Sequence, residues 1–149
     1  MTTGGGSFTV DADSDDNGSG TFTSDNAGSA VAASGGAISI TAADVALTGT
    51  LAGTSTLKFV PSQSNSTIGI GASATGTLNI SDTELGNLAD GFSSITIGDA
   101  TSGTGAVDVN SSTFTDPVTI VGGSIAVTEL NAGSNAVTLT ARSTNITDG

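Results

Sequence analysis

One short pattern recurs along this chain and constrains its fold more than any other feature: two apolar residues with one small or polar residue between them. This alternation predicts short β-strands that turn two side chains inward and one outward. Gly, Ser, Asn, Asp and Ala, which favour turns and loops, separate the units. One series of units begins at Ile38, Leu57, Leu78, Ile95, Val118 and Val137. Their spacing of about 20 residues is typical of a solenoid, in which each coil stacks on the previous one.

A second series of apolar positions falls between members of the first. It begins at Val45, Ile68, Leu85, Val107, Ile125 and Ile146. Two units per coil predict at least two sheets that run the length of the molecule. We therefore predict an all-β protein, a single-stranded right-handed parallel β-helix (β-solenoid) with about 20 residues per coil and roughly six to seven coils. The right hand follows from the general preference of parallel crossovers.

The regular spacing begins at residue 37, and the chain before it is less regular. Residues 1–36 are predicted to form one or more irregular N-terminal coils, with strands at 8–10 and 21–23 on either side of an acidic loop. Residues 37–149 are predicted to form the regular solenoid of the same continuous domain. The first residues have neither the basic region nor the apolar core of a signal peptide. We expect the chain to be a segment of a larger protein.

Residues 81–88 interrupt the strand pattern. Ser81 and Glu84 have the spacing of a capping box, and Leu85 and Leu88 have helical spacing. These residues are equally compatible with a single helical turn that bulges from the coil and with an ordinary turn that places both leucines in the core.

The balance of charge excludes two classes of partner. The chain of 149 residues carries 14 acidic residues against two basic ones, Lys58 and Arg142, for a formal net charge of −12. Nucleic-acid binding relies on Lys and Arg that displace counterions from phosphates, and binding to anionic lipid relies on basic clusters. No apolar run has the length of a membrane span. We therefore expect neither nucleic-acid binding nor membrane insertion.

The missing residue types argue against catalysis. The sequence contains no His and no Cys, which removes imidazole bases, thiol nucleophiles and the usual triads. Carboxylate chemistry on a polysaccharide remains, and Asp108 and Asp116 are the pair considered for it. The predicted outward positions of the first series hold no carboxylate pair: Ser39, Lys58, Asn79, Thr96, Thr119 and Thr138. We predict that the chain is not an enzyme and has no catalytic or cofactor-binding residues.

The acidic loop is the candidate metal site of the sequence. Asp11, Asp13, Asp15 and Asn17 alternate, as oxygen ligands do in calcium loops. An EF-hand loop would have Gly at its sixth position and Glu at its twelfth, where this chain has Asp16 and Phe22. Calcium binding by these four residues is the prediction, and a solvated acidic turn between two strands is the alternative.

Several stretches resemble the repeats of one family. They are Phe8-Thr-Val-Asp-Ala-Asp-Ser-Asp15 with Gly18-Ser-Gly-Thr-Phe-Thr23, Thr67-Ile-Gly-Ile-Gly71, the run from Leu85 to Gly98, and Asp116-Pro-Val-Thr-Ile120. In style they resemble the modules of large repetitive secreted bacterial adhesins of the filamentous-haemagglutinin-like type, which are right-handed parallel β-helices. The resemblance implies export, a location at the outer surface of a bacterium, and a role as a stalk, filament or adhesin.

Two functions follow as hypotheses. The first is a structural or adhesive segment, a rigid acidic solenoid whose neighbours are further coils or copies of itself stacked end to end. The second is a binding module that presents a flat outer face to host or surface glycans or to ice. Thr96, Thr119 and Thr138 are predicted to form part of a threonine row on such a face, although the β propensity of Thr explains the same row.

Overall fold

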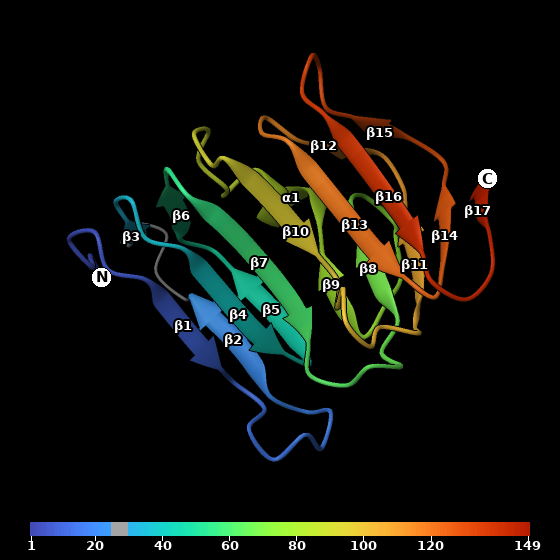
Figure 1. Ribbon diagram of the computed structural model, residues 1–149, viewed down its shortest axis with the longest axis horizontal. Helices are drawn as coiled ribbons and strands as arrows, with labels where there is room; N and C mark the ends of the chain where they lie inside the picture. Colours follow the sequence, from blue (N-terminus) through green and yellow to red (C-terminus); the bar gives the residue numbers. More distant parts are fainter. Residues whose placement is uncertain (25–29) are drawn as a thin grey trace.

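A computed structural model of the chain describes residues 1–24 and 30–149 (Figure 1). These residues form an all-β protein whose paired strands run parallel. The first sheet has six strands, in the order β1 (Phe8–Asp11), β4 (Ile38–Ala42), β7 (Thr56–Pro61), β10 (Ser94–Ile97), β13 (Val118–Gly122) and β16 (Val137–Ala141). Every third strand of the chain thus returns to this sheet, which runs from the N-terminal to the C-terminal side of Figure 1.

Strands of the first sheet are aligned so that residues of the same kind stack. Ile38 pairs with Leu57, Leu57 with Ile95, and Ile95 with Val118. All four side chains are buried in the core. Lys58, which follows Leu57, is exposed. The alternation of inward apolar and outward polar residues is therefore confirmed for this sheet.

The second sheet has five strands, in the order β17 (Ile146–Asp148), β14 (Ser124–Val127), β11 (Ala106–Val109), β8 (Ile68–Ile70) and β9 (Leu78–Ile80). Three further sheets have two strands each: β2 (Thr21–Ser24) with β5 (Asp44–Leu47), β3 (Ala30–Ala33) with β6 (Thr50–Gly53), and β12 (Ser112–Thr113) with β15 (Leu130–Asn131). The prediction of at least two parallel sheets is confirmed, but among the described strands only the first sheet runs from β1 to β16. The second sheet begins at β8, so the prediction that two sheets run the length of the molecule is wrong.

The assignment of Leu78 to the first series is wrong. Its strand, β9, pairs with β8 in the second sheet, while β7 pairs directly with β10 in the first. From Leu57 to its partner Ile95 the chain therefore covers nearly twice the predicted spacing. The loop over residues 71–77 turns the chain back beside β8 before it continues. The alternation around Leu78 specifies a buried face, but it does not specify which sheet provides that face.

Two members of the second series also differ from the prediction. Val45 lies in β5, which pairs with β2 and not with a strand of the second sheet. Leu85 lies in a helical turn, α1 (Asp82–Leu85), and not in a strand. The helical turn and its capping box are confirmed, since the Glu84 carboxylate accepts a hydrogen bond from the Ser81 amide at 2.9 Å.

Side chains complete the edge of β5 that faces away from β2. The Glu84 carboxylate accepts a hydrogen bond from the Leu47 amide at 2.9 Å, and the Asn87 side-chain amide donates to the Leu47 carbonyl at 2.8 Å. The Asp44 carboxylate accepts from the amide of Asn79 in β9, also at 2.9 Å. These bonds take the place of a backbone ladder, because the described strands pair β5 with β2 alone.

The N-terminal strands continue the same pairing. β1 pairs with β4 from Phe8 opposite Ile38 onward, β2 with β5, and β3 with β6. The rings of Phe8 and Phe22 meet edge to face, with centroids 6.2 Å apart, and both pack against the core. This ring pair partly covers the apolar side chains at the β1 end. None of the helices in residues 1–24 and 30–149 combines the length and apolar character that crossing a membrane requires.

Candidate functional site

The acidic loop between β1 and β2 satisfies its own side chains. The Asp11 carboxylate accepts from the Asp13 amide at 3.1 Å, and the Asp13 carboxylate accepts from the Gly18 amide at 2.8 Å. The Asp15 carboxylate accepts from the Asn17 side-chain amide at 2.7 Å. All four predicted ligands are thus joined by hydrogen bonds along the loop. In the described part of the chain no three acidic side chains lie close enough together to hold a metal ion.

Asp13 is the least exposed carboxylate of this loop, with 3% of its surface accessible. The Ser62 hydroxyl beside it lowers the pKa of Asp13 below its usual value, and the Gly18 amide acts in the same direction, while burial opposes both. The Ser62 hydroxyl makes no hydrogen bond of good geometry among the described residues, whereas the Ser62 amide donates to the Ala42 carbonyl at 2.9 Å. The loop also contacts the chain after β7, because the Gln63 side chain donates to the Asp16 carbonyl at 2.8 Å. The Gln63 side chain therefore connects the loop to the chain that follows β7.

The outward residues of the first sheet form one continuous row. The register aligns Thr9, Ser39, Lys58, Thr96, Thr119 and Thr138. The prediction that Thr96, Thr119 and Thr138 lie side by side in one row is confirmed. Two residues further along these strands the row of hydroxyls is not repeated, because Thr140 pairs with Val121, which has no hydroxyl. The face therefore carries a single hydroxyl row interrupted by one ammonium group.

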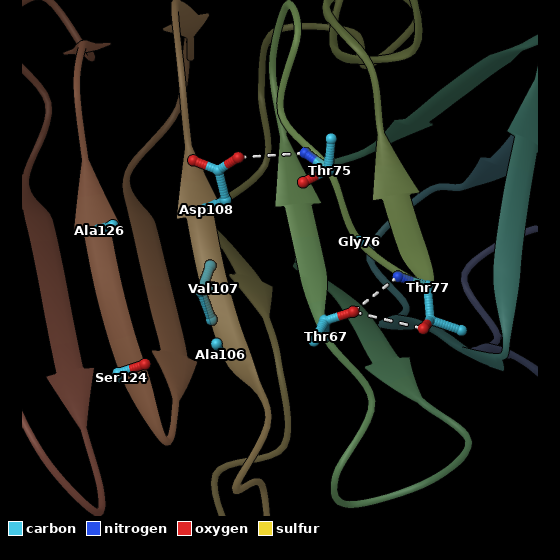
Figure 2. Close-up of a pocket in the computed structure, with 9 residues that line it drawn as sticks. All are labelled: Thr67, Thr75, Gly76, Thr77, Ala106, Val107, Asp108, Ser124 and Ala126. Carbon is cyan, nitrogen blue, oxygen red and sulfur yellow. Dashed lines mark hydrogen bonds between the residues drawn. The ribbon is translucent and has the colours of Figure 1, made fainter. Parts of the chain in front are cut away.

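A shallow groove lies on the outer face of the second sheet (Figure 2). Its volume is about 520 Å³, and Thr67, Thr75, Gly76, Thr77, Ala106, Val107, Asp108, Ser124 and Ala126 line it. The floor is the outer face of β11 and β14, where Ala106 lies opposite Ser124 and Asp108 opposite Ala126. Apart from Asp108, the floor consists of small side chains.

The wall of this groove is the loop over residues 71–77, which packs its backbone directly on β8. A Cβ atom on Gly76 would lie 2.2 Å from the Gly69 nitrogen, so that only glycine fits there. The Thr75 amide donates to Asp108 Oδ2 at 3.1 Å, and the Thr77 amide donates to the Thr67 hydroxyl at 3.0 Å. Figure 2 shows the second oxygen of Asp108 directed away from Thr75 toward the β14 side of the groove.

The C-terminal end of the strand order leaves core-type side chains uncovered. Val137 in β16 is 42% exposed and Ile146 in β17 is 49% exposed, whereas their partners Val118 and Ile125 are buried. β16 and β17 are the outermost strands of their sheets and have one unpaired edge each. This end therefore presents both free backbone groups and apolar surface, which is the composition of a surface that another strand layer would cover.

The two carboxylates considered for catalysis have separate partners. Asp108 lies outward on β11 and accepts from Thr75. Asp116 is buried before β13, where one of its oxygens accepts from the Gly91 amide at 3.0 Å. Asp116 thus connects two turns of the chain, and the contacts of the two residues do not bring them into one site.

Comparison with protein-family models, curated proteins and solved structures gave no match. The groove was missed by sequence reasoning, which looked for function on the first sheet and in the acidic loop. One signal for it exists in the sequence. Small residues at Gly69, Ala106, Ser124 and Ala126 occupy outward strand positions, where larger β-formers are usual.

Proposed function

We propose that this chain is a structural segment of a secreted bacterial surface protein, a rigid acidic β-solenoid that serves as a stalk or a filament-forming unit and performs no catalysis. The proposed form is a single-stranded right-handed parallel β-helix of about six to seven coils. The support for this form is the return of every third strand to the first sheet. The bacterial surface location is proposed from the resemblance of the repeats to filamentous-haemagglutinin-like adhesins.

The observation that carries the proposal is the difference between the interior and the C-terminal end of the sheets. Inward residues of the first sheet are buried from Ile38 to Val118, and the next one in the row, Val137, is exposed. One more layer of strands would bury Val137 and Ile146 and pair the free edges of β16 and β17. We propose that a further coil, contributed by a copy of this chain or by a continuing chain, occupies this place.

A copy stacked in this way would place β1 of one molecule on β16 of the next. Both strands alternate inward apolar residues with outward Thr, as Phe8-Thr-Val10 and Val137-Thr-Leu139 do. Such a head-to-tail contact does not close on itself, so it produces filaments and not rings. With a net charge of −12 on each copy, association is expected to strengthen as salt screens the repulsion between copies.

Electron microscopy and sedimentation of the purified chain over a wide concentration range test the stacking. We expect filaments one molecule wide. Val137→Asp places a charge on the contact surface and is expected to abolish them. Thr138→Asp adds the same charge on the outward side of the same strand and is the matched control. Monomers at every concentration and salt level, or equal assembly of both variants, would contradict stacking of copies.

A second function, binding through the outer face of the first sheet, is favoured by the aligned row of Thr and Ser side chains. Regularly spaced hydroxyls on a flat sheet can hydrogen-bond to a repeating ligand such as a glycan or ice. The growth rate and shape of ice crystals in the presence of the chain test the ice branch. Thr119→Lys, which adds a second ammonium group to the row, is expected to abolish any effect that depends on its flatness.

A further inference from the structure

We infer that the groove on the second sheet is a binding site for a neutral pyranose sugar, with Asp108 as the residue that accepts hydrogen bonds from two adjacent sugar hydroxyls. This inference does not depend on the stacking of copies, since the groove lies on a lateral face. It concerns a different sheet from the hydroxyl row considered above.

The loop that forms the wall of the groove packs closely against β8. Gly69 and Gly76 allow the loop over residues 71–77 to lie on β8 backbone against backbone, and a Cβ at either position would overlap the other segment. The loop then places the Thr75 amide 3.1 Å from Asp108 Oδ2. This bond fixes one oxygen of the carboxylate. The other oxygen is thereby held toward the β14 side of the groove (Figure 2).

The floor accepts a ring of modest size. Ala106, Ala126 and Ser124 rise little above the backbone of β11 and β14, so a flat ring can approach the sheet closely. The volume of about 520 Å³ lies within the range of roughly 300–1,000 Å³ found for small-molecule sites. The methyl groups of the two alanines offer an apolar surface to the C–H face of a sugar. The hydroxyls of Thr67 and Ser124 border it.

The charge of the groove decides between classes of ligand. Asp108 and the net charge of −12 repel anions, which excludes uronates, sialic acids and phosphates. A cation would meet a single half-exposed carboxylate, and an ion pair with one solvent-exposed partner contributes little to binding. A neutral polyol, in contrast, donates several hydrogen bonds at once, and those to an ionised acceptor are the stronger kind. The groove therefore fits a neutral sugar best.

Nuclear magnetic resonance of the 15N-labelled full chain tests the inference. The probes are the methyl glycosides of glucose, galactose and mannose, each titrated to about 50 mM, because a shallow site is expected to bind at millimolar concentration. At least one probe should give saturable shifts for the amides of Thr75, Asp108 and Ala126. Asp108→Asn keeps the size of the side chain but exchanges the free acceptor for a donor, and it should weaken binding at least about tenfold.

Two further variants complete the design. Asp90→Asn makes the same change of charge at an exposed position outside the groove, and it should bind as the original chain does. Ala126→Leu fills the floor opposite Asp108 but keeps the carboxylate, and it should abolish the shifts while the rest of the spectrum stays the same. The inference is overturned if no glycoside gives saturable shifts, if Ala126→Leu still binds, or if n-butylammonium chloride saturates the same amides and the sugars do not.

Discussion

Replacing Glu84 by Ala is expected to release the edge of β5, because this one carboxylate serves both α1 and the strand beside it. Glu84 accepts from the Leu47 amide at 2.9 Å, from the Ser81 amide at 2.9 Å and from the Ser81 hydroxyl at 2.7 Å. Leu47 is buried, so its amide would lose its partner away from water, at a cost of about 1–3 kcal/mol. Loss of the capping box adds about 0.5–2 kcal/mol. We expect the free energy of unfolding to fall by roughly 1.5–5 kcal/mol in total.

Urea unfolding followed by circular dichroism measures the total, and hydrogen exchange of the Leu47 amide measures the local effect. Asp82→Ala removes an exposed acidic residue from the same turn without touching either contact, and it serves as the control. Glu84→Gln keeps an acceptor oxygen and should fall between the two. The reasoning is refuted if Glu84→Ala unfolds at the same urea concentration as Asp82→Ala and leaves exchange at Leu47 unchanged.

Three other outcomes are expected. Gly76→Ala should destabilise the chain by about 1–3 kcal/mol in thermal unfolding, because its Cβ would meet the Gly69 nitrogen at 2.2 Å, whereas Gly86→Ala has ordinary contacts and should not. The pKa values of Asp13 and Asp99 are lowered in the folded chain, the first chiefly by the Ser62 hydroxyl and the second chiefly by the Ser102 hydroxyl. Both carboxylates therefore contribute fully to stability at pH values above the pKa of the unfolded chain. This contribution is lost as the pH falls through the lower pKa of the folded chain. The urea concentration at the midpoint of unfolding should differ less between pH values of about 6 and about 3 when both Asp13→Asn and Asp99→Asn are present than in the original chain. If the acidic loop binds calcium, titration of the chain with calcium should give a saturable heat in calorimetry, and Asp15→Ala should abolish it. A titration without such heat would contradict calcium binding and favour the solvated turn.

The strands of this fold are visible in the sequence because their alternation is nearly free of exceptions. Units such as Leu57-Lys-Phe59 and Ile95-Thr-Ile97 leave only one choice of inward face. The helical turn is also encoded locally, since Ser81 and Glu84 supply both halves of its capping box. Local order of this kind depends on residues within a few positions of one another, and the sequence displays it directly.

The order of strands across the sheets was less predictable. Leu78-Asn-Ile80 has the same alternation as its neighbours, and its place beside β8 depends on how the loop over residues 71–77 folds back. That fold depends on two glycines seven residues apart, Gly69 and Gly76, whose mutual contact no periodicity reveals. The groove and the bond from Thr75 to Asp108 exist only as a result of that loop. A site made by such a long-range contact is not readable from the spacing of residue types.

The replacement of a backbone ladder by side chains along β5 has a mechanical consequence. Tension applied from the β1 end to the β16 end loads the strand interfaces in series, so the weakest one yields first. Between β4 and β7 the load falls on a five-residue backbone pairing. Away from this ladder it falls on one backbone bridge, between Leu51 and Leu88. The remaining load falls on the carboxylates of Asp44 and Glu84 and on the side-chain amide of Asn87, each at the end of rotatable bonds. The molecule under load should therefore bend at this level, with the β4–β7 ladder as its hinge.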